Sequence, residues 1–169
     1  MKLSRLFLLC CISQIAVFMY SCSSDSDNIG DSNEQIITAD ENFIEVQVNR
    51  QNFQPDEVAV NAEGDFVNIV GTETSSNRSV FLTFKLLGEG TLNLGDSSEN
   101  PEGNIAGFLL NTENKGYLTN GIEGNWGEIK ITKLDLENRK ISGTFHFTAY
   151  DQEYRPIVLE DGSFIDVSY

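Results

Sequence analysis

Beyond residue 43, apolar and polar residues alternate along most of the chain with a period of two. In residues 144–150, for example, Phe145, Phe147 and Ala149 alternate with more polar side chains. Successive side chains of a β-strand point to opposite faces of the sheet, so this pattern predicts strands that bury one face. Clusters of Gly, Asn and Asp separate the runs, which is typical of antiparallel sheet. We therefore expect an all-β domain.

The alternating runs extend over residues 43–169. They are residues 43–48, 58–60, 66–71, 79–86, 91–94, 105–110, 117–119, 127–134, 140–150, 157–159 and 163–169. We expect about nine strands, arranged as an antiparallel β-sandwich, with a small closed β-barrel as the alternative. Uneven strand lengths and a long polar loop at residues 96–104 favour the sandwich.

Local geometry is most legible in the C-terminal third. Lys133 is spaced to share one face of its strand with Ile131. Gly143 interrupts the following strand, which predicts a β-bulge. The pair Asp161-Gly162 predicts a hairpin turn between the last two strands.

Before this domain, the chain begins like an exported lipoprotein. Lys2 and Arg5 precede an apolar run from Leu6 to Met19, which is shorter than the about 20 residues that a membrane-spanning helix needs. A basic start, a short apolar core and a small residue at the end are typical of a signal peptide. Residues 19–22 (Met-Tyr-Ser-Cys) resemble a lipobox, at which cleavage occurs just before a lipidated cysteine. We therefore predict a signal peptide at residues 1–21 and lipidation of Cys22.

The cysteine count agrees with this interpretation. Cys10 and Cys11 would leave with the signal peptide, so the mature chain would hold Cys22 as its single cysteine and could form no internal disulfide. Two or more acyl chains attach a protein durably to a membrane surface without crossing it. The alternative is an ordinary secreted protein that is cut nearby, in which Cys22 has no special role.

Residues 22–42 are polar and acidic, and they are predicted to form a flexible tether. About 20 such residues span roughly 25 Å on average. Ser24, Asp25 and Asp27 resemble the acidic export signals that send some bacterial lipoproteins to the outer face of the outer membrane. We expect a cell-envelope protein anchored in the outer membrane, with its single β-domain at residues 43–169.

The charge limits the classes of partner. The chain has a formal net charge of −15. A body of this charge repels phosphate backbones and anionic lipid surfaces, so we expect no nucleic-acid binding. The acidity is typical of a soluble surface, and its alternative meaning is a site for cations or for a basic partner.

Two acidic stretches resemble metal loops without completing the pattern. Residues 25–31 begin like a calcium loop, but Ile29 and Ile36 occupy positions that need oxygen ligands. Residues 96–103 alternate oxygen-bearing side chains, but Pro101 lies where the turn needs Gly. We predict no metal site and no cofactor.

The residues suited to catalysis are few. His146 is the single histidine and lies on the more polar side of its strand, so we expect a surface or rim position. No nucleophile motif accompanies it, and we predict no catalytic residues. With 26 acidic residues, a pair of carboxylates for glycoside hydrolysis cannot be identified by counting. Trp126 lies between Asn125 and Gly127 and is the candidate binding residue, as a platform for a sugar, or else a packed residue at a strand entrance.

The C-terminal third also carries a recognisable set of motifs. They are G-E-I-K-I-T-K-L-D at residues 127–135, I-S-G-T-F-H-F-T-A at residues 141–149 and D-G-S-F at residues 161–164. This set resembles a family of Bacteroidota lipoproteins of unknown function. Near residue 50 the chain departs from the V-N-G and Trp of that family, with Arg50 and Phe53 in their place. The resemblance implies a lipid-anchored β-domain in the cell envelope and supplies no activity.

Together these features favour a non-enzymatic, membrane-anchored protein that binds a protein or glycan partner. Two alternatives stay open: a carrier of a small apolar ligand inside a barrel, and a hydrolase that uses Asp or Glu.

Overall fold

The computed structural model describes residues 42–95, 100–120 and 125–169. All of them belong to one compact unit, Ile37–Tyr169. The predicted signal peptide, Cys22, the calcium-like stretch at residues 25–31 and all of the tether except Asn42 lie outside the described residues. No helix within the described ranges is long and apolar enough to cross a membrane.

The described residues form strands and one turn of 3-10 helix (η1). The elements are β1 (Phe43–Val48), β2 (Gln51–Phe53), β3 (Glu57–Glu63), β4 (Phe66–Glu73), β5 (Arg78–Lys85), β6 (Gly90–Gly95), β7 (Ile105–Leu110), η1 (Asn111–Glu113), β8 (Lys115–Leu118), β9 (Asn125–Asp135), β10 (Lys140–Tyr150) and β11 (Pro156–Ser168). The all-β prediction is confirmed, with eleven strands in place of about nine.

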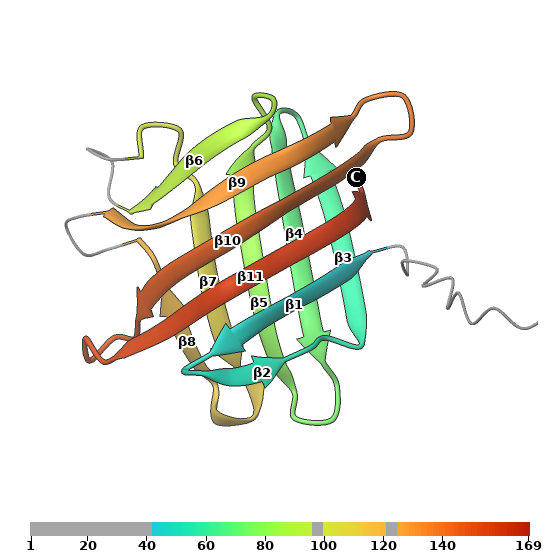
Figure 1. Ribbon diagram of the computed structural model, residues 1–169. Coiled ribbons are helices and arrows are strands. Elements are labelled where there is room, and N and C mark those ends of the chain that lie inside the picture. Colours follow the sequence, from blue (N-terminus) through green and yellow to red (C-terminus); the bar gives the residue numbers. More distant parts are fainter. Residues whose placement is uncertain (1–41, 96–99, 121–124) are drawn as a thin grey trace, which may run out of the picture. The chain divides into compact units, whose positions relative to one another are not determined.

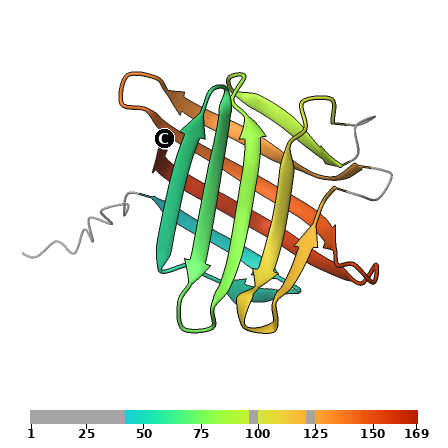
Figure 2. The same ribbon diagram turned by 180° about the vertical axis from the view of Figure 1, so that it is seen from behind.

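The strands form one antiparallel sheet that folds into two layers (Figure 1). The front layer runs β6-β9-β10-β11-β1-β2, and the back layer runs β8-β7-β5-β4-β3. The layers join where the end of β10 pairs with β8, at Tyr150 and Leu118. Figure 2 shows from behind that the strands of the two layers cross obliquely. No ladder among the described strands joins β2 to β3, so the sheet stays open and the sandwich is favoured over the closed barrel.

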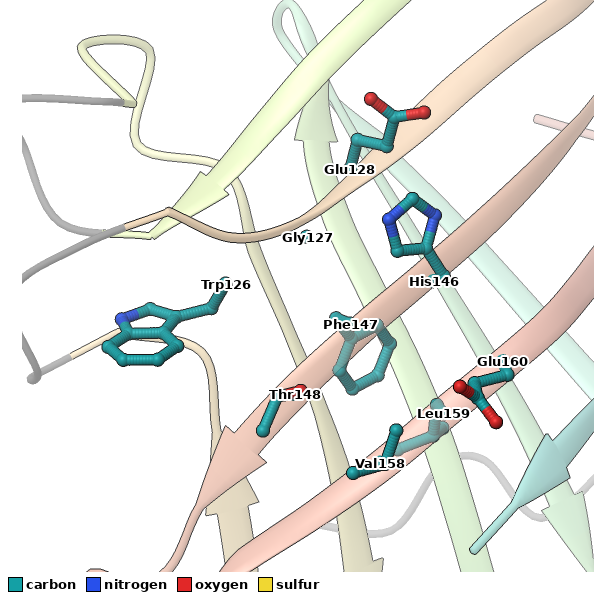
Figure 3. A pocket seen from close by; sticks show the side chains of 9 residues that line it. All are labelled: Trp126, Gly127, Glu128, His146, Phe147, Thr148, Val158, Leu159 and Glu160. Atoms are coloured by element: carbon teal, nitrogen blue, oxygen red, sulfur yellow. The ribbon is translucent and has the colours of Figure 1, made fainter. Parts of the chain in front are cut away.

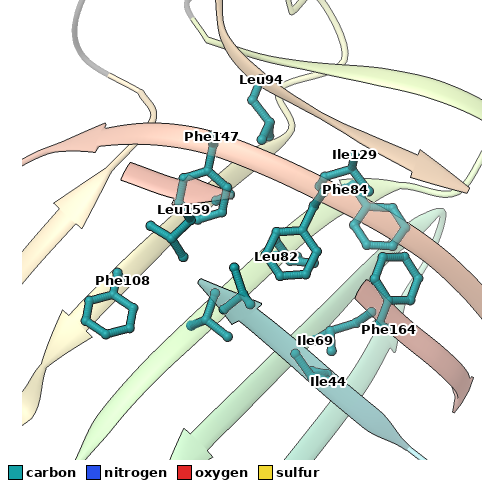
Figure 4. Close-up of a cluster of buried hydrophobic side chains, with 14 of the residues drawn as sticks. Ile44, Ile69, Leu82, Phe84, Leu94, Phe108, Ile129, Phe147, Leu159 and Phe164 are labelled. Atoms are coloured by element: carbon teal, nitrogen blue, oxygen red, sulfur yellow. The ribbon is translucent and has the colours of Figure 1, made fainter. Parts of the chain in front are cut away.

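The alternation that predicted the strands places their apolar side chains between the layers. The five largest fully buried side chains are Phe53, Phe84, Phe108, Phe147 and Phe164. Phe84 of the back layer and Phe164 of the front layer stack with their ring centres 6.4 Å apart (Figure 4). Phe164 also stacks on Phe145 at 6.5 Å, so one aromatic cluster ties the two layers together.

Bulges in the front layer explain why two sequence predictions are wrong: the face on which Lys133 lies and the hairpin turn at Asp161-Gly162. The register of β9 and β10 shifts at Gly143, as predicted, and the additional residue lies in β9 between Ile131 and Lys133. Lys133 is therefore exposed and does not share the buried face of Ile131, contrary to the sequence interpretation.

The hairpin turn expected at Asp161-Gly162 is also wrong. β11 continues through both residues as one strand, with a register shift against β1 and β10 at this point. Asp161 has a φ of 53°, which is the left-handed conformation that an Asp tolerates in a bulge. The pair therefore bends a long strand and does not reverse the chain.

Candidate functional site

The outer face of the front layer holds a hollow of about 410 Å³ over β9, β10 and β11. Its lining residues are Trp126, Gly127, Glu128, His146, Phe147, Thr148, Val158, Leu159 and Glu160. We call it the tryptophan hollow. Phe147 and Leu159 are buried and pack in the core between the layers. The polar and aromatic surface of the hollow therefore comes from the outward-facing residues of the three strands.

Strand register explains why these side chains meet. His146 on β10 lies directly opposite Glu128 on β9. On the other side, the bulge in β11 places Glu160 and Asp161 between the residues that pair with Phe145 and Phe147, and therefore beside His146. The imidazole thus lies between acidic residues of two neighbouring strands.

Trp126 lies at the opposite end of the hollow. Figure 3 shows its ring at one end, the group of Glu128, His146 and Glu160 at the other, and Thr148 and Val158 between them. The Trp126 ring is half-buried and packs edge-on against Tyr150, with ring centres 4.9 Å apart and an interplanar angle of 73°. This contact holds the ring at the entrance of β9, as the packing interpretation of Trp126 expects, while the same ring lines a surface hollow. Its role as a sugar platform stays a prediction.

A second hollow, of about 620 Å³, adjoins the first. Its lining residues are Glu45, Thr144, Phe145, His146, Glu160, Asp161, Gly162 and Ser163. We call it the acidic hollow. His146 and Glu160 line both hollows, so the two lie side by side over β9, β10, β11 and β1, and we call the pair the groove.

The groove is strongly acidic. Glu45, Glu128, Glu160 and Asp161 line it, and none of the Lys and Arg residues in the described ranges does. Glu45 accepts a hydrogen bond from Ser163 at 3.4 Å, and Asp161 accepts one from Gln47 at 3.2 Å. The side chains of Glu128, His146 and Glu160 make no hydrogen bond or ion pair within the described part of the chain. They are available to a ligand.

Sequence reasoning found part of this site. It identified Trp126 and placed His146 at a surface or rim, and His146 is exposed at the point shared by the two hollows. It did not identify Glu128 or Glu160. The alternation around Gly127 and Leu159 put both carboxylates on the outer face, but only the strand register brings them to His146.

Among the described carboxylates, one with a strongly lowered pKa lies away from the groove. Asp151, in the turn after β10, is buried, which alone would raise its pKa. Hydrogen bonds from the backbone and side chain of Arg155, from Lys115 and from the backbone of Glu153 outweigh this and lower the pKa from 3.8 to about 2. Lys115 lies 3.2 Å and Arg155 2.8 Å from its carboxylate. Asp151 therefore holds a turn together.

No group of three or more His, Cys, Asp or Glu residues in the described ranges is placed to hold a metal ion. Of the predicted acidic loop at residues 96–103, residues 96–99 lie outside the described ranges. In the remainder, buried Asn100 donates to the backbone oxygen of Asn104 at 2.6 Å and accepts from its N–H at 2.8 Å. These contacts close the loop on itself.

Comparison with known proteins gives a single family. No curated protein and no solved structure matches the chain. One family model, described as a domain of unknown function (DUF6252), matches residues 40–168. That range includes every described strand and both hollows, and the chain therefore belongs to the DUF6252 family.

Proposed function

We propose that this protein is a lipid-anchored component of the cell envelope that binds a glycan in the groove without catalysing a reaction. Cys22 would carry the lipid, and residues 23–42 would connect it to the β-domain. The single observation that carries the glycan assignment is the composition of the groove. It combines an aromatic ring at one end with an imidazole and carboxylates at the other. The resemblance to Bacteroidota lipoproteins supports the envelope location.

A sugar ring suits this arrangement chemically. Small-ligand sites combine apolar and aromatic surface with a few polar groups that fix orientation. The apolar face of a sugar ring packs against an aromatic side chain, and its hydroxyl groups hydrogen-bond to carboxylate and imidazole groups. Trp126 offers the first contact, and Glu128, His146 and Glu160 offer the second.

A peptide partner is less well served by the same surface. β10 pairs with β9 on one side and with β11 on the other. Its backbone groups are therefore used within the sheet, and a peptide cannot add here as another strand. Recognition in the groove has to come from side chains, which favours a ligand with many hydroxyl groups.

A glycan array followed by calorimetry tests this proposal. The purified β-domain should bind at least one class of oligosaccharide, and Trp126→Ala should weaken that binding by about fivefold or more, since a lost aromatic platform costs on the order of 1–3 kcal/mol. The matched control is Tyr154→Ala, which removes an exposed aromatic ring outside the groove. Binding that is absent throughout, or that Trp126→Ala leaves unchanged, contradicts the proposal.

A hydrolase is the second candidate, because Glu128 and Glu160 line one hollow on either side of His146. Glycosidases use two carboxylates that flank the scissile bond, and one of them is usually a buried acid with a raised pKa. Glu128 is half-buried and Glu160 is exposed, so the environment favours binding over acid catalysis. Release of shorter sugars by the wild type, and its loss in Glu160→Gln with ligand binding retained, would favour the hydrolase.

The carrier alternative is less well supported. Phe84, Phe145 and Phe164 stack on one another between the layers, where an internal ligand would have to lie. The two hollows lie on the outer face of the front layer, and their polar lining comes from outward-facing residues.

A further inference from the structure

We propose that the free edge of β3 binds an extended segment of a partner polypeptide that carries Lys or Arg at both ends. The segment would add to the back layer as a further strand. This inference goes beyond the proposed function and is independent of it, because the groove lies over the front layer.

β3 is an edge strand whose second side is open among the described residues. It lies at the end of the back layer and pairs with β4, and no ladder among the described strands uses its other side (Figure 1). All seven residues of β3 pair with β4 without a register shift. Every second residue of such a strand directs its N–H and C=O groups away from its partner, so a row of backbone donors and acceptors faces outward.

β3 lacks the features that usually protect a sheet edge. Natural sheets blunt their edges with Lys, Pro, a bulge or a covering segment. The sequence of β3 is Glu-Val-Ala-Val-Asn-Ala-Glu, without Lys or Pro, and its ladder has no bulge. At the other end of the sheet, β6 is partly covered, because the side chain of Asn104 donates to the backbone oxygen of Asn93 at 3.2 Å. The edge of β3 is therefore suited to strand addition.

Two half-buried valines favour an added strand with alternating apolar residues. Val58 and Val60 pack against the core but stay half-buried. A strand laid along β3 would place its inward-facing side chains beside these valines and would remove apolar surface from water. The partner segment should therefore carry β-branched residues at every second position.

The two ends of β3 indicate the charge of the partner. Glu57 and Glu63 are exposed and make no hydrogen bond or ion pair within the described part of the chain. If two copies of β3 paired antiparallel about Val60, each Glu57 would lie opposite a Glu63, and like charges placed directly opposite destabilise a strand pair. A second copy is therefore disfavoured, whereas Lys or Arg at both ends of a partner strand would meet an opposite charge at each position.

The chain's own N-terminal segment is a competing occupant with the wrong charge. Residues 23–41 contain Asp and Glu but no Lys or Arg. Laid along β3, this segment could not supply a positive charge to either end. The net charge of −15 likewise favours a basic partner over an acidic one.

Two peptides of matched sequence test the inference. The Lys peptide is Lys-Val-Thr-Val-Thr-Val-Lys, and the Glu peptide has Glu in place of both Lys residues; the termini of both are capped. Each is titrated into the lipid-free protein, residues 23–169, and followed by NMR of the backbone amides. The Lys peptide should shift the amides of β3 and bind about tenfold more tightly than the Glu peptide at low salt, because two attractive end pairs replace two repulsive ones. The difference should shrink as the ionic strength rises.

A charge swap in the protein separates the edge of β3 from the general field of the molecule. Glu57→Lys combined with Glu63→Lys should reverse the order of affinity, so that the Glu peptide binds more tightly than the Lys peptide. The matched control is Glu113→Lys combined with Glu137→Lys, which makes the same change in net charge at exposed positions outside β3. The control should keep the wild-type order. Both double variants should keep the wild-type melting temperature, because all four positions are exposed.

The outcomes concern the edge of β3 and leave glycan binding in the groove to its own test. The inference is overturned if the Lys peptide does not bind, if both peptides bind equally, if the shifted amides lie outside β3, or if the control variant also reverses the order. Self-association of the wild type through β3 overturns it in favour of a second copy. Tighter binding of the Lys peptide after removal of residues 23–39 overturns it in favour of the chain's own N-terminal segment.

Discussion

Asp151 is a buried carboxylate on which two cations and two backbone amides converge. Its side chain is 4% exposed, and it accepts hydrogen bonds from the backbone of Glu153 and Arg155, each at 2.9 Å. We predict that Asp151→Asn lowers the melting temperature at neutral pH, because the amide cannot pair with Lys115 and Arg155 and cannot accept as many hydrogen bonds. Thermal unfolding followed by circular dichroism measures the effect.

The pH dependence of this effect has a defined direction. The folded pKa of Asp151, about 2, lies below the ordinary 3.8, so the carboxylate stabilises the fold fully above pH 3.8. That stabilisation is lost as the pH falls through the folded pKa. The difference in melting temperature between wild type and Asp151→Asn should therefore narrow between about pH 4 and pH 2. Glu153→Gln, at a side chain that is 72% exposed, is the control and should show little difference. A gap that stays constant with pH would contradict the assignment.

Gly143 is a second residue at which a small substitution should change stability, because it has no room for a Cβ atom. A Cβ at this position would collide with the backbone oxygen of Lys130 and lie 2.5 Å from the Phe164 ring. We predict that Gly143→Ala lowers the free energy of unfolding by about 1–3 kcal/mol, the usual cost of overpacking a core. Urea denaturation measures it. Thr144→Ala, at the exposed neighbour on the same strand, should change the free energy by less than about 0.5 kcal/mol. If the two substitutions changed the free energy of unfolding equally, the close packing around Gly143 would not be the cause of the loss.

At the scale of elements, the contact of β11 with β5 ties the two layers together. Phe164 is fully buried and stacks on Phe84 across the layers, whereas its neighbour Ile165 is 38% exposed on the outer face. We predict that Phe164→Ala lowers the free energy of unfolding by about 3–5 kcal/mol and that Ile165→Ala lowers it by less than about 1 kcal/mol. Chemical denaturation of both variants measures the contrast. Similar losses of stability in the two variants would contradict the assignment of Phe164 to the buried face of β11 and of Ile165 to the outer face.

How much of the fold the sequence can predict depends on the element. β1 and β10 have the predicted bounds, Phe43–Val48 and Lys140–Tyr150, because a long alternation with one apolar face needs no knowledge of partners. β11 was predicted as two strands, since Asp161-Gly162 carries the same local signal in a bulge as in a hairpin. The three residues of β2 carry too short a pattern to be recognised, and β2 is defined by its pairing with β1.

The candidate site shows the same limit. Trp126 could be identified because it is the single tryptophan and lies between Asn125 and Gly127 at the entrance of a strand. Glu128 and Glu160 lie far apart in the sequence and resemble any other outward-facing acid of the chain. Only the pairing of β9, β10 and β11, with a bulge that shifts the register, places both beside His146. Such a constellation is a property of the register, which alternation alone does not determine.

At the scale of the whole molecule, the net charge of −15 acts together with the groove. Within a Debye length of about 10 Å at 0.1 M salt, the acidic surface attracts cations and repels phosphate groups. Near the groove, which no Lys or Arg among the described residues lines, a positively charged ligand would therefore be favoured over an anionic one. The same field opposes binding to anionic lipids. The membrane attachment in the proposed function would therefore depend on the lipid at Cys22.

The lipid anchor can be tested without disturbing the β-domain. We predict that Cys22→Ala moves the protein, expressed in a bacterium that processes lipoproteins, from the membrane fraction to the soluble fraction. A chain without acyl groups loses about 0.8 kcal/mol of membrane affinity for every buried CH₂. Fractionation with immunoblotting measures this. The melting temperature should not change, because the described residues contain no cysteine. Ser24→Ala is the control, because it alters a neighbouring polar residue and keeps the sulfur. A Cys22→Ala protein that still sediments with the membrane, or a native protein whose Cys22 carries no acyl group in mass spectrometry, would remove the anchor from the proposed function and leave the groove to be tested by itself.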